Sequence, residues 1–184
     1  MASRKEITNH LFRLVHIARS AGMKRALTEV DPEPNLNFWR LILGNQLDTA
    51  VLEWCKIFGT DDEPTHWKKV VPPENHNQFR DRLFEVTGTT SRAWAAYWGE
   101  MTTYRNLQVA HHIELNPDTN YPVLDITLKS SFCYYDYLIK ELRSLGETRC
   151  PDNLQSYYEL FTHQAREIAS KAMTSTATII EQVY

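Results

Sequence analysis

At residues 91–112 the chain reads SRAWAAYWGEMTTYRNLQVAHH. Its large apolar side chains return every three or four residues, as at Trp94, Trp98 and Met101, and this is the period of one face of an α-helix. The next position on that face is Arg105, so an apolar face becomes polar before the pattern ends. We therefore predict a helix over residues 91–112 with a group of polar side chains at its C-terminal end.

The same period recurs along the rest of the chain, whereas the alternation typical of strands is hard to find. Further helices are expected after a capping pair at Ser3 and Glu6, over 37–58, around 78–86, from Asp125, and after the turn at 150–152. Residues 60–76, rich in Asp, Pro, Asn and His, are expected to form a long surface connection with a short turn near Trp67. The predicted fold class is all-α, an antiparallel bundle of five to six helices forming one domain over residues 1–184.

Composition and charge narrow the possible functions. The chain has 42% hydrophobic and 23% charged residues, which is ordinary for a globular domain with one core. Its formal net charge is −3, so the whole molecule provides no basic field that would attract nucleic acid. Any contact with RNA therefore requires a local patch or a site shared between two subunits.

The three cysteines, Cys55, Cys133 and Cys150, are dispersed and form no CxxC pair. This arrangement argues against a zinc or redox motif and fits a reducing compartment. The N-terminus lacks an apolar run typical of a signal peptide, and no segment approaches the roughly 18 apolar residues of a membrane helix. We expect a cytoplasmic protein that has no cofactor, no metal and no membrane partner.

The polar end of the 91–112 pattern contains Arg105, Asn106, His111 and His112. These residue types suit the cleavage of RNA without a metal. A histidine titrates near neutral pH and can take a proton from the 2′-hydroxyl or give one to the leaving 5′-oxygen. An arginine stays protonated, and its planar fork of donors matches the oxygens of a phosphate. An asparagine can orient either group.

This segment resembles the signature of the HEPN ribonuclease superfamily. In that signature an arginine, a polar residue that is often asparagine, and a histidine that often follows an alanine lie on one helix of a four- to five-helix bundle. Arg105-Asn106 and Ala110-His111 match it over seven residues, and the likeness elsewhere is that of a helical bundle. The resemblance implies Arg105 and His111 as the catalytic pair and Asn106 as their support. It is nearest to the abortive-infection and toxin-type branch, which implies an RNA substrate, a homodimer with a composite site, and a possible antitoxin partner.

Two alternatives remain open at this stage. His112 lies two ideal turns from Arg105 on one face, whereas the family pattern favours His111. The cluster is also compatible with a solvated helix end in which Arg105 pairs with Glu100 or Glu114. The chain would then be a non-catalytic helical module that binds a partner protein or a small ligand.

Other polar groups receive structural interpretations. The notch Asn45, Gln46 and Asp48 within an apolar helix either faces the 91–112 helix and supports it or faces solvent. The acidic run 61–63 is expected to be a solvated turn, and most of the tryptophans follow core periodicity. His10, His16, His66, His76 and His163 are too scattered to predict a metal site.

Overall fold

The computed structural model describes residues 2–110, 121–146 and 150–182. Within these ranges the chain forms six α-helices and no strand, so the predicted all-α fold class is confirmed. The α-helices are α1 (Arg4–Val30), α2 (Asn37–Phe58), α3 (His76–Thr87), α4 (Ser91–Tyr104), α5 (Asp125–Ser144) and α6 (Leu154–Thr176). Three short helical turns accompany them: η1 (Trp67–Lys69), η2 (Pro73–Asn75) and η3 (Arg105–Ala110).

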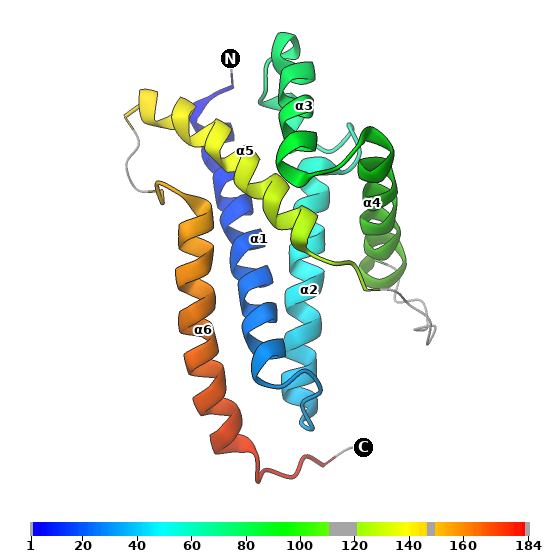
Figure 1. Cartoon of the computed structure of the whole chain (residues 1–184), viewed down its shortest axis with the longest axis vertical. Coiled ribbons are helices and arrows are strands. Elements are labelled where there is room, and N and C mark those ends of the chain that lie inside the picture. Colours follow the sequence, from blue (N-terminus) through cyan, green and yellow to red (C-terminus); the bar gives the residue numbers. More distant parts are fainter. Residues whose placement is uncertain (1, 111–120, 147–149, 183–184) are drawn as a thin grey trace.

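The long helices α1, α2 and α6 lie side by side and form the length of the molecule (Figure 1). α2 returns antiparallel to α1, whereas α6 runs beside α1 in the same direction (Figure 1). α5 crosses them obliquely and packs on α1 and α3 (Figure 1). The shorter α3 and α4 lie beside one end of these long helices, so residues 91–110 occupy an edge of the bundle rather than its centre (Figure 1).

The helix ends follow local sequence rules at several places. Ser3 and Glu6 form the predicted capping box, in which each side chain binds the other residue's backbone N–H. α2 spans residues 37–58, as its apolar pattern predicts. Asp125 was expected to cap α5, but Leu124 occupies the cap position and Asp125 is the first helical residue. An acidic residue in the first turn still interacts favourably with the helix dipole.

Close contact between α1 and α6 depends on a small residue. A Cβ atom at Gly22 would lie 2.7 Å from the Thr162 Oγ1 atom of α6. Thr162 is buried, and its hydroxyl donates a hydrogen bond to the Tyr158 carbonyl at 2.7 Å. The absence of a side chain at Gly22 therefore allows the two long helices to approach each other without moving Thr162.

The core contains polar groups whose hydrogen bonds are made inside the protein. Trp54 is fully buried on α2, and its Nε1 donates to the Ser130 Oγ of α5 at 3.0 Å. His10 is buried on α1, with its Nδ1 atom 2.9 Å from the Tyr134 hydroxyl. Burial lowers the pKa of His10 to about 4, and the nearby Arg13 charge acts in the same direction. Both groups join α5 to the long helices.

The connection between α2 and α3 differs from the expected surface loop. His66, Trp67, Val70 and Val71 are all buried. The turn η1 directs Trp67 inward, where its ring lies 4.9 Å from that of Phe79 on α3, measured between centroids. The short turn predicted near Trp67 is therefore confirmed, whereas the surface position predicted for the centre of residues 60–76 is wrong. A composition rich in turn residues does not reveal the apolar groups that such a turn places in the core.

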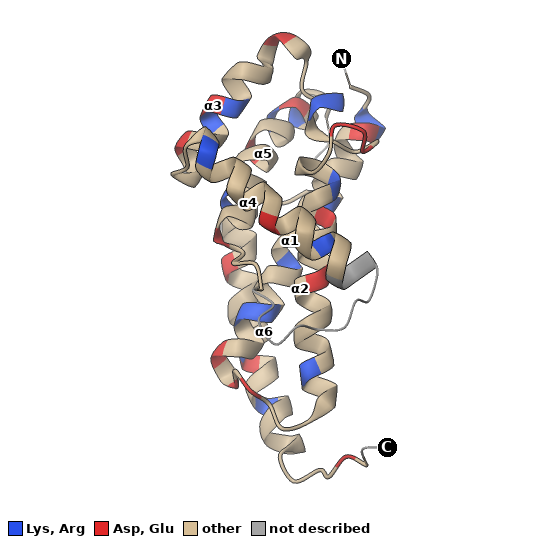
Figure 2. Cartoon of the chain, turned by 90° about the vertical axis from the view of Figure 1, so that its right-hand side faces the viewer, with Lys and Arg blue, Asp and Glu red and all other residues tan. Residues whose placement is uncertain are grey.

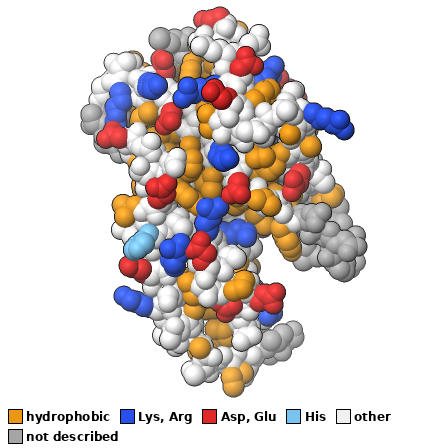
Figure 3. All heavy atoms as spheres, viewed as in Figure 1, with side chains coloured by type: hydrophobic (Ala, Val, Ile, Leu, Met, Phe, Trp, Pro, Cys, Tyr) orange, Lys and Arg blue, Asp and Glu red, His pale blue; other side chains and the backbone are white. Residues whose placement is uncertain are grey.

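Charges of both signs are distributed along the molecule. Figure 2 shows Lys and Arg next to Asp and Glu on most of the helices in that view. On the face seen in Figure 3, apolar, acidic and basic side chains alternate without a continuous basic area. In the part of the chain that the structure describes, no helix combines the length and hydropathy that crossing a membrane requires.

Candidate functional site

The segment that carries Arg105 is not a regular continuation of α4. The α-helix ends at Tyr104, and residues 105–110 form the single π-helical turn η3. The predicted helix is therefore present through residue 110, but it is α-helical only to Tyr104, and residues 111–112 lie outside the described residues. A π-helical turn closes its hydrogen-bonded ring over one more residue than an α-helix, so the side chains leave the faces assigned by ideal α-helical spacing. Such turns are frequent at functional sites.

Arg105 opens this turn, and its side chain is only 19% exposed. Its Nη1 lies 3.4 Å from Glu63 Oε1, and its Nε donates to Asn106 Oδ1 at 3.0 Å. A guanidinium has five N–H groups, so three of them have no partner among the described residues. Arg105 is thus a half-buried cation that is held in one orientation and keeps donors for an anion.

The residue before it connects η3 to α2. Tyr104 is buried, and its hydroxyl donates to Asp48 Oδ1 at 2.7 Å. Burial raises the pKa of Tyr104, and the hydrogen bond to the Asp48 carboxylate adds to this effect. For Asp48, the first of the two interpretations of the polar notch holds, since it faces the segment that carries Arg105. Asn45 is exposed.

Cys55 lies behind this site and offers no nucleophile. The thiol is buried on α2, with Sγ 3.7 Å from the Met101 carbonyl oxygen. Burial raises the pKa of the Cys55 thiol to about 12, although the Arg105 charge opposes that rise. Because only the thiolate is a good nucleophile, Cys55 is inert near neutral pH.

Glu63 reaches Arg105 from the loop that follows α2, and both ends of this loop are fixed. At its start, the Gly59 carbonyl accepts a hydrogen bond from Trp98 Nε1 at 3.1 Å. A Cβ at Gly59 would lie only 2.2 Å from the Cys55 carbonyl oxygen, so a glycine is required there. Further along, the Thr65 hydroxyl donates to the Lys56 carbonyl at 3.0 Å. Glu63 therefore faces Arg105 from a position that the backbone defines.

The predicted site residues have different outcomes. Arg105 and Asn106 are neighbours that hydrogen-bond to each other, and Asn106 is exposed. His111 and His112 lie outside the described residues, as does Glu114, one of the two carboxylates expected to pair with Arg105. Among the described residues, Arg105 pairs with Glu63, from the run that was expected to be a solvated turn. No local pattern marks Glu63, because 42 positions separate it from its partner.

A second group of charges lies on the same loop. Lys68 Nζ donates to Asp61 Oδ2 at 2.5 Å, and the buried His66 places Nε2 3.4 Å from Asp61 Oδ1. Burial lowers the pKa of His66 to about 4, while Asp61 opposes this effect. In the described part of the chain, no three His, Cys, Asp or Glu side chains cluster in a way that could hold a metal ion.

Comparison with family models, with curated proteins and with solved structures found no match to this chain. Arg105 is oriented by an amide and a carboxylate, lies at the edge of the bundle, and has N–H donors without a partner in the described part of the chain. This arrangement suits binding of an anion with several oxygens, of which a phosphodiester is one.

Proposed function

We propose that this protein is a metal-independent endoribonuclease of the HEPN type, in which Arg105 binds the phosphate that is cleaved. The observation that carries the proposal is the half-buried guanidinium of Arg105, fixed by Asn106 and Glu63 on a π-helical turn. Partial burial strengthens the attraction between a cation and a phosphate, because less water screens them. Holding the donors in place before the substrate arrives avoids reorganising them during the reaction.

In the proposed reaction, a base removes the proton of the 2′-hydroxyl and the resulting oxyanion attacks the adjacent phosphorus. The bond from phosphorus to the 5′-oxygen breaks, and that oxygen receives a proton. The products are a 2′,3′-cyclic phosphate and a free 5′-hydroxyl. We assign Arg105 to the charge that develops on the phosphate oxygens, His111 to proton transfer, and Asn106 to the orientation of Arg105.

The acidic balance of the chain fits a site assembled from two copies. A net charge of −3 gives no long-range attraction for RNA, and one Arg105 is partly offset by Glu63. Two subunits that bring their η3 turns together would double the local positive charge without changing the rest of the surface. We therefore propose a homodimer with a composite site, and a neutralising antitoxin protein as a possible partner.

The direct test is cleavage of a labelled RNA in excess EDTA. The wild type is expected to yield 2′,3′-cyclic phosphate ends, and Arg105→Ala is expected to lower the rate by about 100-fold, the usual effect of removing one donor to a transition-state oxyanion. His111→Ala and His112→Ala, compared side by side, identify the histidine that transfers the proton. Arg92→Ala is the matched control, because Arg92 is an exposed arginine at the start of α4, the helix that η3 follows.

Two results would contradict the proposal. One is a wild type that leaves RNA intact at every concentration tested, and the other is Arg105→Ala cleaving as fast as Arg92→Ala. Toxicity on expression gives an independent readout. An active ribonuclease is expected to slow growth, and Arg105→Ala or His111→Ala is expected to relieve this effect.

A non-catalytic helical module is the second candidate. The observation that favours it is the Glu63–Arg105 pair, since an arginine with a carboxylate partner does not require a substrate to neutralise it. In that case Arg105→Ala changes the affinity for a partner protein or small ligand and leaves RNA intact. The same EDTA assay separates the two candidates, because only the first predicts cyclic phosphate products.

A further inference from the structure

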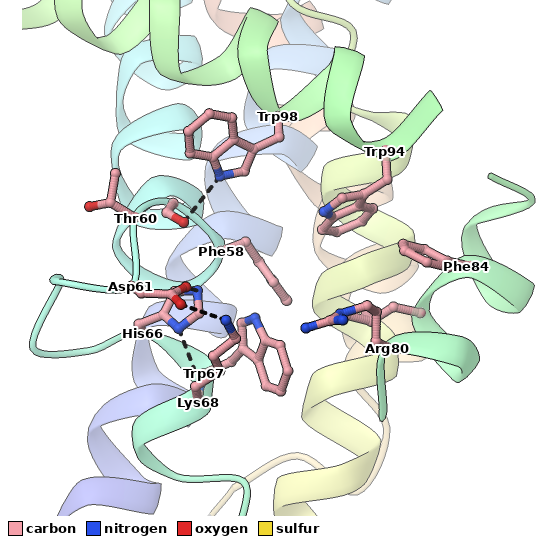
Figure 4. A pocket seen from close by; sticks show the side chains of 12 residues that line it. Phe58, Thr60, Asp61, His66, Trp67, Lys68, Arg80, Phe84, Trp94 and Trp98 are labelled. Carbon is pink, nitrogen blue, oxygen red and sulfur yellow. Dashed lines mark hydrogen bonds and ion pairs between the residues drawn. The ribbon is translucent and has the colours of Figure 1, made fainter. Parts of the chain in front are cut away.

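A cavity of about 410 Å³ opens between the loop after α2, helix α3 and helix α4 (Figure 4). Sites for small ligands usually have volumes of roughly 300–1,000 Å³, so the cavity has room for one compact ligand. Residues 59–61 and 66–68, on either side of Glu63 in the same loop, line it, whereas Glu63 and Arg105 do not. The cavity is thus a second candidate site, distinct from Arg105.

Aromatic rings from four elements line this cavity. They are Phe58 of α2, Trp67 of η1, Phe84 of α3, and Trp94 and Trp98 of α4. Trp94 and Trp98 are only half buried, although both were interpreted as packing residues from their spacing. They pack against the core and also present ring surface to the cavity (Figure 4). Such rings provide stacking surfaces for planar ligands, including nucleobases.

Arg80 is a cation of the cavity lining that can bind a ligand. Figure 4 shows its side chain extending from α3 into the cavity, with the guanidinium near Trp67. No hydrogen bond or ion pair joins Arg80 to another residue in the described ranges. The second cation, Lys68, is already bound to Asp61 at 2.5 Å. The lining therefore has one excess positive charge, that of Arg80.

His66 contacts Asp61, the acidic residue that lines the cavity, and adds no charge of its own. Its Nδ1 accepts a hydrogen bond from the Lys68 backbone N–H at 3.3 Å, so the ring proton lies on Nε2 and points to Asp61. Burial holds the pKa of His66 near 4, so the ring is neutral at pH 7. The Asp61 carboxylate thus has two partners, Lys68 and His66, and it forms no ion pair with Arg80.

We propose that this cavity binds one nucleotide, with its base stacked on the tryptophans of α4 and its phosphate bound by Arg80. The base accounts for the aromatic rings, and the phosphate accounts for an arginine that has no hydrogen-bond or ion-pair partner among the described residues. A guanidinium binds phosphate oxygens through two parallel hydrogen bonds, which matches this role. The nucleotide is either free or one unit of a single-stranded RNA, since both present the same base and phosphate.

Isothermal titration calorimetry on the full chain tests the proposal. The probes are adenosine 5′-monophosphate, adenosine, inorganic phosphate, and a single-stranded 2′-O-methyl RNA that cannot be cleaved by 2′-hydroxyl attack. The monophosphate is expected to bind saturably and at least about tenfold more tightly than adenosine or phosphate alone, because only it uses both parts of the cavity. The oligonucleotide is compared with the monophosphate on Arg105→Ala, because the strand is also proposed to bind Arg105. There, tighter binding of the oligonucleotide identifies the strand as the source, and tighter binding of the monophosphate identifies the free nucleotide.

Two variants assign the two halves of the site. Arg80→Ala is expected to weaken the monophosphate about tenfold and to leave adenosine unchanged. Trp94→Leu is expected to weaken both by about tenfold, since stacking is lost in each case. Lys171→Ala is the control, because it removes one exposed positive charge on α6, away from the cavity. Circular dichroism confirms that each variant is folded, and Arg80 is exposed, so its replacement should not disturb the core.

Three results would overturn the proposal. They are the absence of saturable binding by both the monophosphate and the oligonucleotide, equal affinities of Arg80→Ala and wild type, and inorganic phosphate binding as tightly as the nucleotide. Arg105→Ala separates this proposal from the proposed cleavage, because it should bind the monophosphate like the wild type. If the protein binds nucleotides but leaves RNA intact, the proposed nucleotide site stands and the proposed cleavage at Arg105 fails.

Discussion

The long helices and the region around Arg105 are stabilised in different ways. In α1, α2 and α6, apolar side chains at helical spacing are buried between neighbouring helices. Around Arg105, single polar contacts join residues far apart in the sequence, as in the pairs Glu63–Arg105 and Asp48–Tyr104. The first kind of stability is repeated along each helix and visible in the sequence. The second kind depends on individual pairs, and each can be removed by one substitution.

The largest effect on stability is expected in the long helices, from Trp54→Ala on α2. Trp54 is fully buried, hydrogen-bonds to Ser130, and has ring contacts with Phe58, Trp94 and Tyr97. We expect a loss of about 3–5 kcal/mol in the free energy of unfolding, measured by urea denaturation, because a large cavity remains.

Trp39→Ala on the same helix is the matched control for Trp54→Ala. Trp39 is half buried, and its Nε1 donates to Thr176 Oγ1 at 3.1 Å. We expect less than half the loss seen for Trp54→Ala, since a half-buried ring leaves a smaller cavity. Equal losses for Trp54→Ala and Trp39→Ala would mean that the contribution of these side chains to stability does not depend on how deeply they are buried.

The next effect is a dependence of stability on pH, and it involves both regions. His10 lies on the long helix α1, and His66 lies in the loop between α2 and α3 that also carries Glu63. Burial lowers the pKa of each from 6.5 in a model peptide to about 4. Between these values the unfolded chain binds protons that the folded chain does not, so stability is complete above about pH 6.5 and falls as the pH decreases toward 4. We expect each imidazole to cost roughly 2 kcal/mol between pH 7 and 5, measured by urea denaturation at several pH values.

Substitution assigns this pH dependence to its source. His10→Gln and His66→Gln should each reduce the slope of stability against pH, whatever their effect at pH 7. His16→Gln is the control, because His16 is exposed on the same helix as His10. An unchanged slope in both test variants would attribute the acid sensitivity to carboxylates instead.

The contrast between the regions also explains what the sequence predicts. The bounds of α2 and the capping box of α1 follow from spacing and from local hydrogen bonds, which are properties of neighbouring residues. Arg105 and Asn106 could be selected because they adjoin each other in a recognisable segment. Glu63 and Trp67 could not, because their partners Arg105 and Phe79 come into contact only after the chain has folded. The π-helical turn is likewise absent from any periodic pattern.

A smaller effect is expected where η3 meets α2. Tyr104→Phe keeps the buried ring and removes the hydrogen bond to Asp48. We expect a loss of about 1 kcal/mol in the free energy of unfolding, since the acceptor is a carboxylate. Asn45→Ala, an exposed position one turn earlier on α2, should change stability by less than about 0.5 kcal/mol. A Tyr104→Phe variant as stable as Asn45→Ala would mean that η3 is not fastened to α2 through this contact.

The smallest effect on stability, and the most informative one for function, is expected from Glu63→Gln. The pair with Arg105 is partly exposed and 3.4 Å long, so its loss should cost only about 0.5 kcal/mol in unfolding free energy. If Arg105 binds the phosphate, removing the neighbouring negative charge should tighten binding of an uncleavable RNA by about two- to tenfold, measured by fluorescence anisotropy.

Asp62→Asn separates that local effect from net charge. Asp62 is exposed in the same loop and is adjacent to Glu63 in the sequence, so the two variants raise the charge of the chain equally. Tighter RNA binding by Glu63→Gln alone places the phosphate at the guanidinium that Glu63 contacts. Equal changes in RNA affinity for both variants would show that binding depends only on the average charge of the loop. That result would contradict the assignment of the phosphate to Arg105.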